Sequence, residues 1–222
     1  MSIAQRLRQI QSGLPPEVRL IAVSKTHPVE SILEAVAAGQ HVFGENRVQE
    51  LVEKYQALPE LEWHLIGHLQ TNKVKYIAPF VHLIHGVDSL KLLKEINLQA
   101  AKNQRVIDCL LQMYIATEET KFGLDEEEIK EILESEEFRS FENVRICGIM
   151  GMATNTRDQA VVEKEFYHLH DIFQYVKRTW FSDKSYFCEI SAGMSQDYTL
   201  AVRAGSTMVR IGSEIFGERS KY

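Results

Sequence analysis

The chain has 222 residues, of which 45% are hydrophobic and 25% are charged, an ordinary globular composition. Its formal net charge of −6 argues against nucleic acid or an anionic membrane as the main partner, because both need a basic footprint. No stretch approaches the roughly 20 apolar residues of a membrane span, and the amino terminus lacks the apolar core and cleavage site of a signal peptide. We therefore expect a cytoplasmic protein.

The first predicted element is a short amphipathic helix that is capped by Ser2, stops at Gly13 and carries Ile3, Leu7 and Ile10 on one face. Eight short apolar runs follow, separated by segments that are mostly of helical period. The runs are residues 20–24, 41–44, 63–66, 83–87, 108–115, 144–149, 186–190 and 207–211. The clearest helical segments are residues 29–38, 47–57, 89–103, 125–135 and 157–180, and a short one is 71–78.

This order of elements predicts a barrel. Continuous apolar runs are typical of strands buried on both faces, and their alternation with helices indicates a parallel sheet. Eight runs without a linker between them favour a single (β/α)8 TIM barrel over residues 1–222, with one extra amino-terminal helix. A doubly wound open sheet is the structural alternative, but it normally has fewer strands, and no GxGxxG motif follows the first run.

Two further patterns have ordinary structural explanations. The cysteines lie far apart, form no CxxC pair and each fall inside a predicted strand, so we expect buried, reduced thiols at Cys109, Cys147 and Cys188. The Glu-rich segment 125–137 has carboxylates around most of a helix. A solvated helix face explains it better than a metal site, with an inward stripe of Ile129, Ile132 and Leu133.

Lys25 is the first candidate functional residue, because chemistry in such a barrel takes place at the carboxyl ends of the strands. It directly follows the first apolar run and precedes a helix that starts at Pro28. A lysine in this position can be partly desolvated, which lowers its pKa and makes its amine nucleophilic toward aldehydes. An exposed lysine at a strand end is the alternative.

The loops after the seventh and eighth runs suggest a phosphate site. Both combine small residues and hydroxyl groups with a following helix, whose first turn has unpaired N–H groups. Barrels frequently bind phosphate at these two loops, and the alternative is a pair of ordinary serine-capped helices. The glycines and serines concerned are Ser191, Gly193, Ser195, Gly212 and Ser213.

Arg210 lies just before Gly212 and would be a permanent cation in the barrel mouth. A negatively charged ligand would explain an arginine there, and a structural ion pair is the alternative. His64 and His68 could suggest a metal pair, but no third ligand has suitable spacing, so we expect no metal.

Long motifs along nearly the whole chain resemble the YggS/PROSC family of pyridoxal phosphate homeostasis proteins. They are AVSKTHP (22–28), FGENRVQE (43–50), HLIGHLQTNK (64–73), KFG (121–123), GIMGMAT (148–154), SAGMSQDY (191–198) and STMVRIGSEIFG (206–217). The resemblance implies a barrel similar to the amino-terminal domain of bacterial alanine racemase, with pyridoxal 5′-phosphate (PLP) as its cofactor.

By the same resemblance, Lys25 carries PLP as a Schiff base and Arg210 faces the pyridine nitrogen. The backbone of Gly212 and Ser213, together with Ser191, would grip the phosphate. This agrees with the geometry expected of a closed barrel, in which the first and eighth strands are neighbours.

Asn46 and His64 match family positions near the cofactor. Lys121 matches a family lysine suggested as a secondary PLP acceptor. At His27 several relatives carry a second lysine instead, which alters the charge around Lys25 without removing the anchor.

We expect a PLP carrier or regulator that hands the cofactor to apoenzymes, without strong catalysis. An amino-acid racemase or decarboxylase is the alternative, since alanine racemase works with an arginine at the ring nitrogen. We expect no racemase-like second domain, hence an open site and a monomer. A third hypothesis is a barrel that binds phosphorylated metabolites without a Schiff base.

Overall fold

The computed structural model describes residues 1–116 and 123–217, and its centre is a closed barrel of eight parallel strands. Each strand pairs with the next along the chain, and β8 pairs with β1 to close the ring. The strands are β1 (Arg19–Val23), β2 (Val42–Glu45), β3 (Glu62–Leu65), β4 (Leu83–Val87), β5 (Ile107–Met113), β6 (Val144–Gly151), β7 (Glu189–Ser191) and β8 (Met208–Ile211). The predicted (β/α)8 barrel is therefore confirmed.

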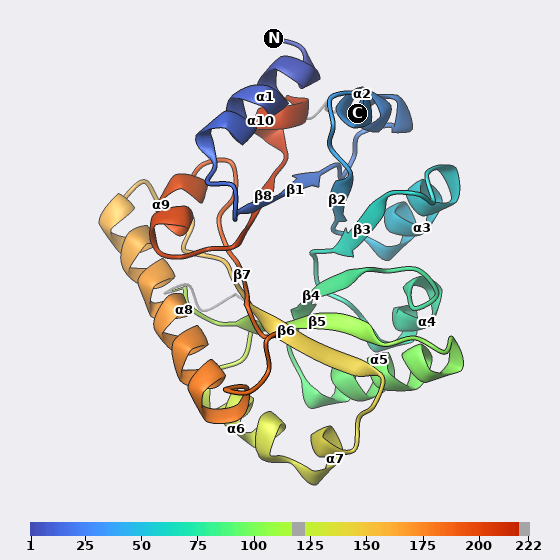
Figure 1. Cartoon of the computed structure of the whole chain (residues 1–222), viewed down its shortest axis with the longest axis vertical. Coiled ribbons are helices and arrows are strands. Elements are labelled where there is room, and N and C mark those ends of the chain that lie inside the picture. The colour runs from blue at the N-terminus through green and yellow to red at the C-terminus, as the bar shows by residue number, and fades with distance from the viewer. Residues whose placement is uncertain (117–122, 218–222) are drawn as a thin grey trace.

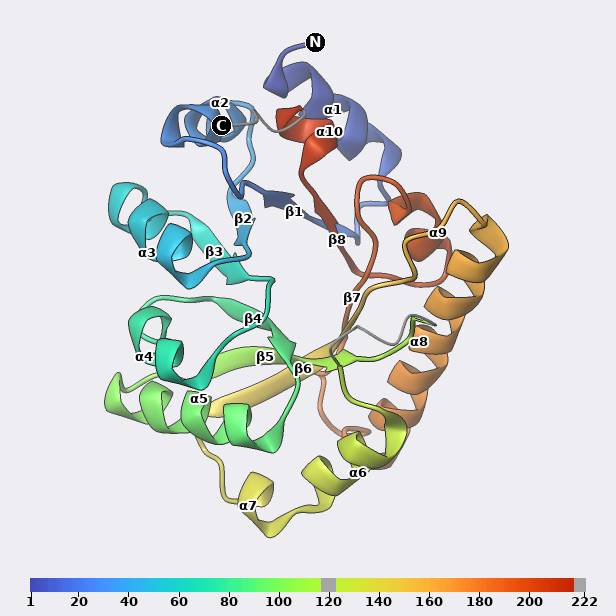
Figure 2. The same cartoon turned by 180° about the vertical axis from the view of Figure 1, so that it is seen from behind.

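Helices surround the ring of strands on its outer side (Figures 1 and 2). They are α1 (Ile3–Gly13), α2 (Val29–Ala37), α3 (Val48–Ala57), the 3-10 turn η1 (Thr71–Lys73), α4 (Val74–Ile77), α5 (Leu90–Lys102), α6 (Glu126–Glu134), α7 (Glu136–Arg139), α8 (Gln159–Trp180), α9 (Tyr198–Arg203) and α10 (Ser213–Phe216). No helix in the described residues is long and apolar enough to cross a membrane.

The extra amino-terminal helix forms as predicted. Ser2 and Gln5 make reciprocal capping hydrogen bonds at its start, and Leu7 and Ile10 are buried. The helix lies beside α10, so the two ends of the described chain meet on one side of the barrel (Figure 1). Arg6 donates a hydrogen bond to the carbonyl of Ile215 there, at 3.4 Å.

Side chains alternate between the two sides of each strand, which divides the core into two parts. The larger part packs strands against helices, and Trp63 and Phe43 are among its largest buried side chains. The smaller part fills the barrel and includes Ile21, Met150 and Met208. The same alternation decides which polar side chains point into the barrel.

The seventh strand differs from the prediction of 186–190, because β7 starts only at Glu189. The aromatic ring of Phe187 packs instead against Phe173 of α8 and Phe181, with ring centroids 5.1 and 4.4 Å apart. The apolar residue that suggested an earlier strand therefore belongs to the helix-facing core.

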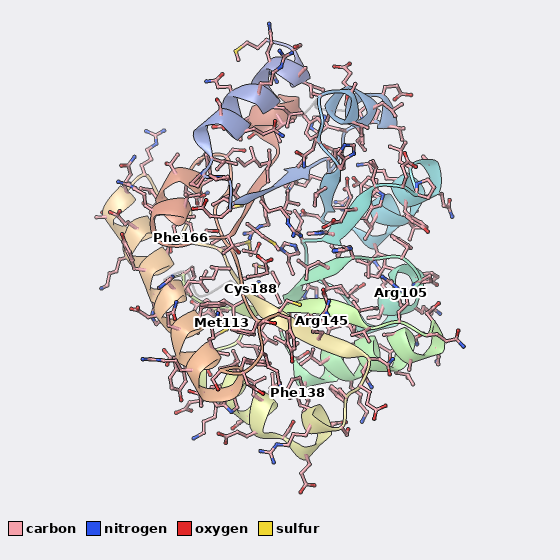
Figure 3. The ribbon with its side chains drawn as sticks, in the orientation of Figure 1. Arg105, Met113, Phe138, Arg145, Phe166 and Cys188 are labelled. Atoms are coloured by element: carbon pink, nitrogen blue, oxygen red, sulfur yellow. The ribbon has the colours of Figure 1, made fainter. Side chains whose placement is uncertain are left out.

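The prediction of three buried cysteines is wrong for one of them. Cys109 and Cys147 are buried free thiols, but Cys188 is exposed because it precedes β7 rather than lying within it. Figure 3 labels Cys188 together with Arg105 and Arg145, which mark the starts of β5 and β6. Arg145 makes two hydrogen bonds with Asp108, at 2.6 and 2.7 Å, which join these two strands.

Candidate cofactor site

A cavity of about 530 Å³ opens at the carboxyl ends of the strands. Its lining brings together residues from β1, the loops after β2, β6 and β7, and the end of β8. Five of the predicted site residues line it: Lys25, Asn46, Arg210, Gly212 and Ser213. The pairing of β1 with β8, in which Ala22 is opposite Ile211, places the Lys25 loop next to the Gly212 loop.

Ser191 and His64 are fully buried and lie below this cavity. Both point into the barrel, but each lies two residues before a position at the rim. Because a strand rises about 3.3 Å per residue, two residues correspond to about 6.6 Å of depth. Their contact with the cavity runs through Arg210, whose long side chain reaches it. Lys121 lies outside the described residues, and its role stays a prediction.

One network outside the barrel clamps the backbone on both sides of Lys25. Before it, the Ser24 hydroxyl donates to Oε1 of Glu45 at 2.6 Å, and Nζ of Lys54 donates to the Ser24 carbonyl at 2.7 Å. After it, the N–H of Thr26 donates to Oε2 of Glu50 at 2.9 Å. Since Ser24 points outward to α3, alternation directs Lys25 toward the barrel axis.

Thr26 has a φ of 66°, in the left-handed region that costs a β-branched residue free energy. Such a conformation persists only when its surroundings enforce it. Here the carboxylate of Glu50 holds the Thr26 N–H, and the ring of His27 stacks on Phe216 with centroids 4.9 Å apart. The strain and the clamp together fix the turn that carries Lys25.

The outer network contains a buried ion pair. Nζ of Lys54 lies 2.6 Å from Oε1 of Glu45, whose side chain is fully buried and whose Oε2 has no hydrogen-bond partner in the described chain. Burial raises the pKa of Glu45, against the opposing effect of the Lys54 charge. At Glu50 burial is outweighed by the Thr26 N–H and by Lys54, which hold the pKa of that carboxyl below its ordinary value.

A second network crosses the barrel interior below the cavity. Arg210 is 4% exposed and donates from Nη1 to the Ser191 carbonyl and hydroxyl, at 2.8 and 2.6 Å. The hydroxyl of Ser191 lies 2.9 Å from Nδ1 of His85, and Nε2 of His85 lies 2.9 Å from Nδ1 of His64. Nε2 of His64 is in turn 2.9 Å from the carboxylate of Glu62.

Burial lowers the pKa of the arginine and of both histidines in this hydrogen-bonded series. It lowers the pKa of Arg210 to about 10, so the guanidinium stays charged at neutral pH. It also lowers the pKa of His64, and that of His85 well below its ordinary value, which keeps both imidazoles neutral. With these charges, the hydrogen bonds can all run in one direction, and each group then has a partner. The donors in order are Arg210, Ser191, His85 and His64, with Glu62 as the final acceptor.

The glycines of the predicted phosphate loops are required by packing. A Cβ on Gly212 would lie 3.0 Å from the carbonyl oxygen of Val23, so the residue permits the close approach of β8 to β1. Gly193 has a φ of 93°, and a Cβ there would lie 2.7 Å from that of Ala201. The hydroxyls of Ser213 and Ser195 are 3.0 Å apart at the cavity wall.

Comparison with known proteins agrees with this architecture. Residues 1–220 match the model of the alanine racemase N-terminal domain family. The pyridoxal phosphate homeostasis protein of Aquifex aeolicus is 40% identical over 203 residues, which cover 90% of this chain and 87% of that protein. The Escherichia coli K12 protein of the same name is 35% identical, covering 92% and 87%.

Solved structures agree as well. PipY of Synechococcus elongatus, solved with PLP bound, has a TM-score of 0.89 and 36% identity, with 97% of this chain and 100% of that chain covered. An alanine racemase of Clostridium difficile has a TM-score of 0.79 at 16% identity, which shows the shared fold. This chain covers 57% of that racemase chain.

The fold and its mouth cavity define a member of the alanine racemase N-terminal domain family. Within that family, the chain belongs to the pyridoxal phosphate homeostasis proteins.

The hydrogen bonds inside the barrel predict unequal losses of stability when two serines near the ends of β7 and β8 are replaced. Ser191→Ala leaves Nδ1 of His85 and one N–H of Arg210 without a partner, so we expect a loss of about 2 kcal/mol in the free energy of unfolding. Urea denaturation of the PLP-free protein measures it. Ser213→Ala is the control and should change stability by less than about 0.5 kcal/mol, because Ser213 is exposed. Equal losses would contradict the arrangement.

Removing Lys54 should have a pH-dependent cost. Lys54→Met leaves Glu45 buried without its cation, which we expect to destabilise the protein by about 3 kcal/mol at pH 7.5. Burial raises the pKa of Glu45 in the folded state, so the folded state binds this proton more tightly than the unfolded chain does. The free energy of unfolding therefore falls as the pH rises above the pKa that Glu45 has in the unfolded chain. Without Lys54 the pKa rises further, so the deficit relative to wild type should shrink at pH 5.

Urea titrations at the two pH values measure this difference. The double variant Glu45→Gln with Lys54→Met is the matched control, because it removes the buried charge together with its partner. We expect it to recover most of the lost stability with little pH dependence. A single variant with the same deficit at both pH values would contradict this account of Glu45.

Proposed function

We propose that the chain binds PLP in the mouth cavity through a Schiff base to Lys25, and that it acts as a cytoplasmic carrier or regulator of PLP. The observation that carries this proposal is that Lys25 and Arg210 line one cavity, from the adjacent strands β1 and β8. The names of the relatives support the role in PLP homeostasis, and PipY with PLP bound supports the cofactor.

The donors of Arg210 fit the cofactor's ring nitrogen. A guanidinium has five N–H groups, and three of them are bonded to Ser191 and Gly151. Two remain, within the described chain, to reach an acceptor in the cavity. Arg210 thus supplies a fixed cation that cannot give up its proton at neutral pH. Ser191 and His64 act through Arg210, as positioning residues.

Ser213, Ser195 and the backbone at Gly212 fit the phosphate. The two hydroxyls meet at the cavity wall, and the first turn of α10 adds N–H groups without helical partners. Because α10 has only four residues, these donors act as individual hydrogen bonds and not through a helix dipole. Asn46 lines the wall from the β2 side.

The amine of Lys25 supplies the covalent bond. The neutral amine would be the nucleophile that holds PLP through its aldehyde group. Bound PLP provides an aldehyde and an electron sink. The clamp on Ser24 and Thr26 holds the amine at the mouth, where the aldehyde arrives.

Reduction with borohydride should place a pyridoxyl group on Lys25. We expect the PLP-loaded protein to be yellow and peptide mapping to find the label at this residue. Lys25→Ala should abolish the yellow species, whereas Ser213→Ala should only weaken retention of PLP, because other donors still hold the phosphate. A colourless complex would favour phosphate binding without a Schiff base, and label confined to surface lysines would contradict the assignment.

A transfer assay distinguishes a carrier from an enzyme. We expect an apoenzyme that requires PLP to be reactivated by the loaded protein, with free PLP at equal concentration as the reference. Lys25→Ala protein treated in the same way should add nothing beyond free PLP. Steady turnover of an amino acid that is lost in Lys25→Ala would instead favour the racemase or decarboxylase alternative.

A further inference from the structure

Three potential metal ligands converge at the amino-terminal end of the barrel, on the side opposite the mouth cavity. They are Glu62 and His64 of β3 and His82, the residue before β4. Their ligating atoms all lie within 4.8 Å of one another. Oε1 of Glu62 is 2.9 Å from Nε2 of His64 and 3.4 Å from Nε2 of His82.

We propose that Glu62, His64 and His82 bind one divalent transition-metal ion of the zinc class, with water completing the coordination. Zinc takes imidazole nitrogen and carboxylate oxygen at about 2.0–2.2 Å, so two ligands of a tetrahedral ion lie about 3.3 Å apart. The two observed separations from Glu62, 2.9 and 3.4 Å, bracket that value. The ligand nitrogens of His64 and His82 lie within 4.8 Å of each other, and a bound ion would bring them to the same separation.

The backbone holds these three positions in place. Glu62 and His64 are two residues apart on one strand, so both side chains point into the barrel. The N–H of His82 donates to the carbonyl of Trp63 at 2.9 Å, which brings the start of β4 beside them. The sequence did not reveal this third ligand, because His82 is far from His64 along the chain and comes beside it only where β3 pairs with β4.

His64 is also held through its second ring nitrogen. Its Nδ1 lies 2.9 Å from Nε2 of His85, and both rings are fully buried. Metal-binding histidines almost always fix their orientation by such a hydrogen bond from the other nitrogen. In the metal-bound form the N–H of His64 lies at Nδ1 and is donated to His85, so the hydrogen bond between the imidazoles runs in the opposite direction.

Arg19 competes with the ion for Glu62. Its Nη1 lies 3.3 Å from Oε1 of Glu62, and its side chain is 45% exposed, so it can turn away into solvent. The effect of removing Arg19 therefore distinguishes a metal site from a cluster that is held by hydrogen bonds alone. Removing Arg19 should strengthen metal binding, whereas removing His82 should weaken it.

Calorimetric titration of Zn²⁺ into the PLP-free full chain, stripped of metal, tests the proposal. We expect one site per chain, an affinity at least about tenfold weaker in His82→Ala, and a severalfold stronger one in Arg19→Ala. His82 is 52% exposed, so its removal should leave the fold intact, which thermal melting checks. Co²⁺ in the same site should give the visible bands of four-coordinate cobalt.

His68→Ala is the matched control, because it removes another histidine that pairs with a carboxylate, Asp88 at 3.1 Å. Its zinc affinity should equal that of the wild type. The same affinity in wild type and His82→Ala, or loss of the site in His68→Ala, would overturn the proposal. Because PLP is absent throughout, these outcomes are independent of Lys25 and of the function proposed above.

Discussion

The pairing of β1 with β8 is the constraint on which the rest of this structure depends. It joins the first and last strands in a parallel register from Arg19 opposite Met208 to Ala22 opposite Ile211. An open sheet of the same elements would leave the Lys25 turn and Arg210 on strands that are not neighbours. Once the ring is closed, the alternation of side chains decides which of them share the interior.

Two polar networks lie on opposite sides of the strands. Outside the barrel, Lys54 ties α3 to the turn that carries Lys25. Inside it, Arg210 is bonded to the Ser191 hydroxyl and to two backbone carbonyls, while the carboxylate of Asp197 acts on its charge from the cavity side. A buried cation is tolerated when its N–H groups are bonded, and this arrangement leaves part of the guanidinium directed to the mouth.

The pattern of apolar and polar residues along the sequence predicted most of the fold but only part of the site. The apolar run 83–87 matches β4 at both ends, because a doubly buried strand depends on its own residues. The partners of the site residues depend on the tertiary structure. Lys54 looks like one more solvated helix residue in the sequence, and His85 is a single polar residue in an apolar run whose partner Ser191 lies far along the chain. The sequence signal for the network inside the barrel was the presence of polar residues at alternate positions of the strands, which point inward.

Closure by the last strand also has a consequence for synthesis. Because β8 supplies both the pairing with β1 and Arg210, a nascent chain lacks a complete binding cavity until β8 has left the ribosome. Until β8 is in place, the edge of β1 has unpaired backbone groups, and such an edge can pair with another chain. A ligand that contacts both strands would then bind only chains in which β8 is in place, and would stabilise its pairing with β1.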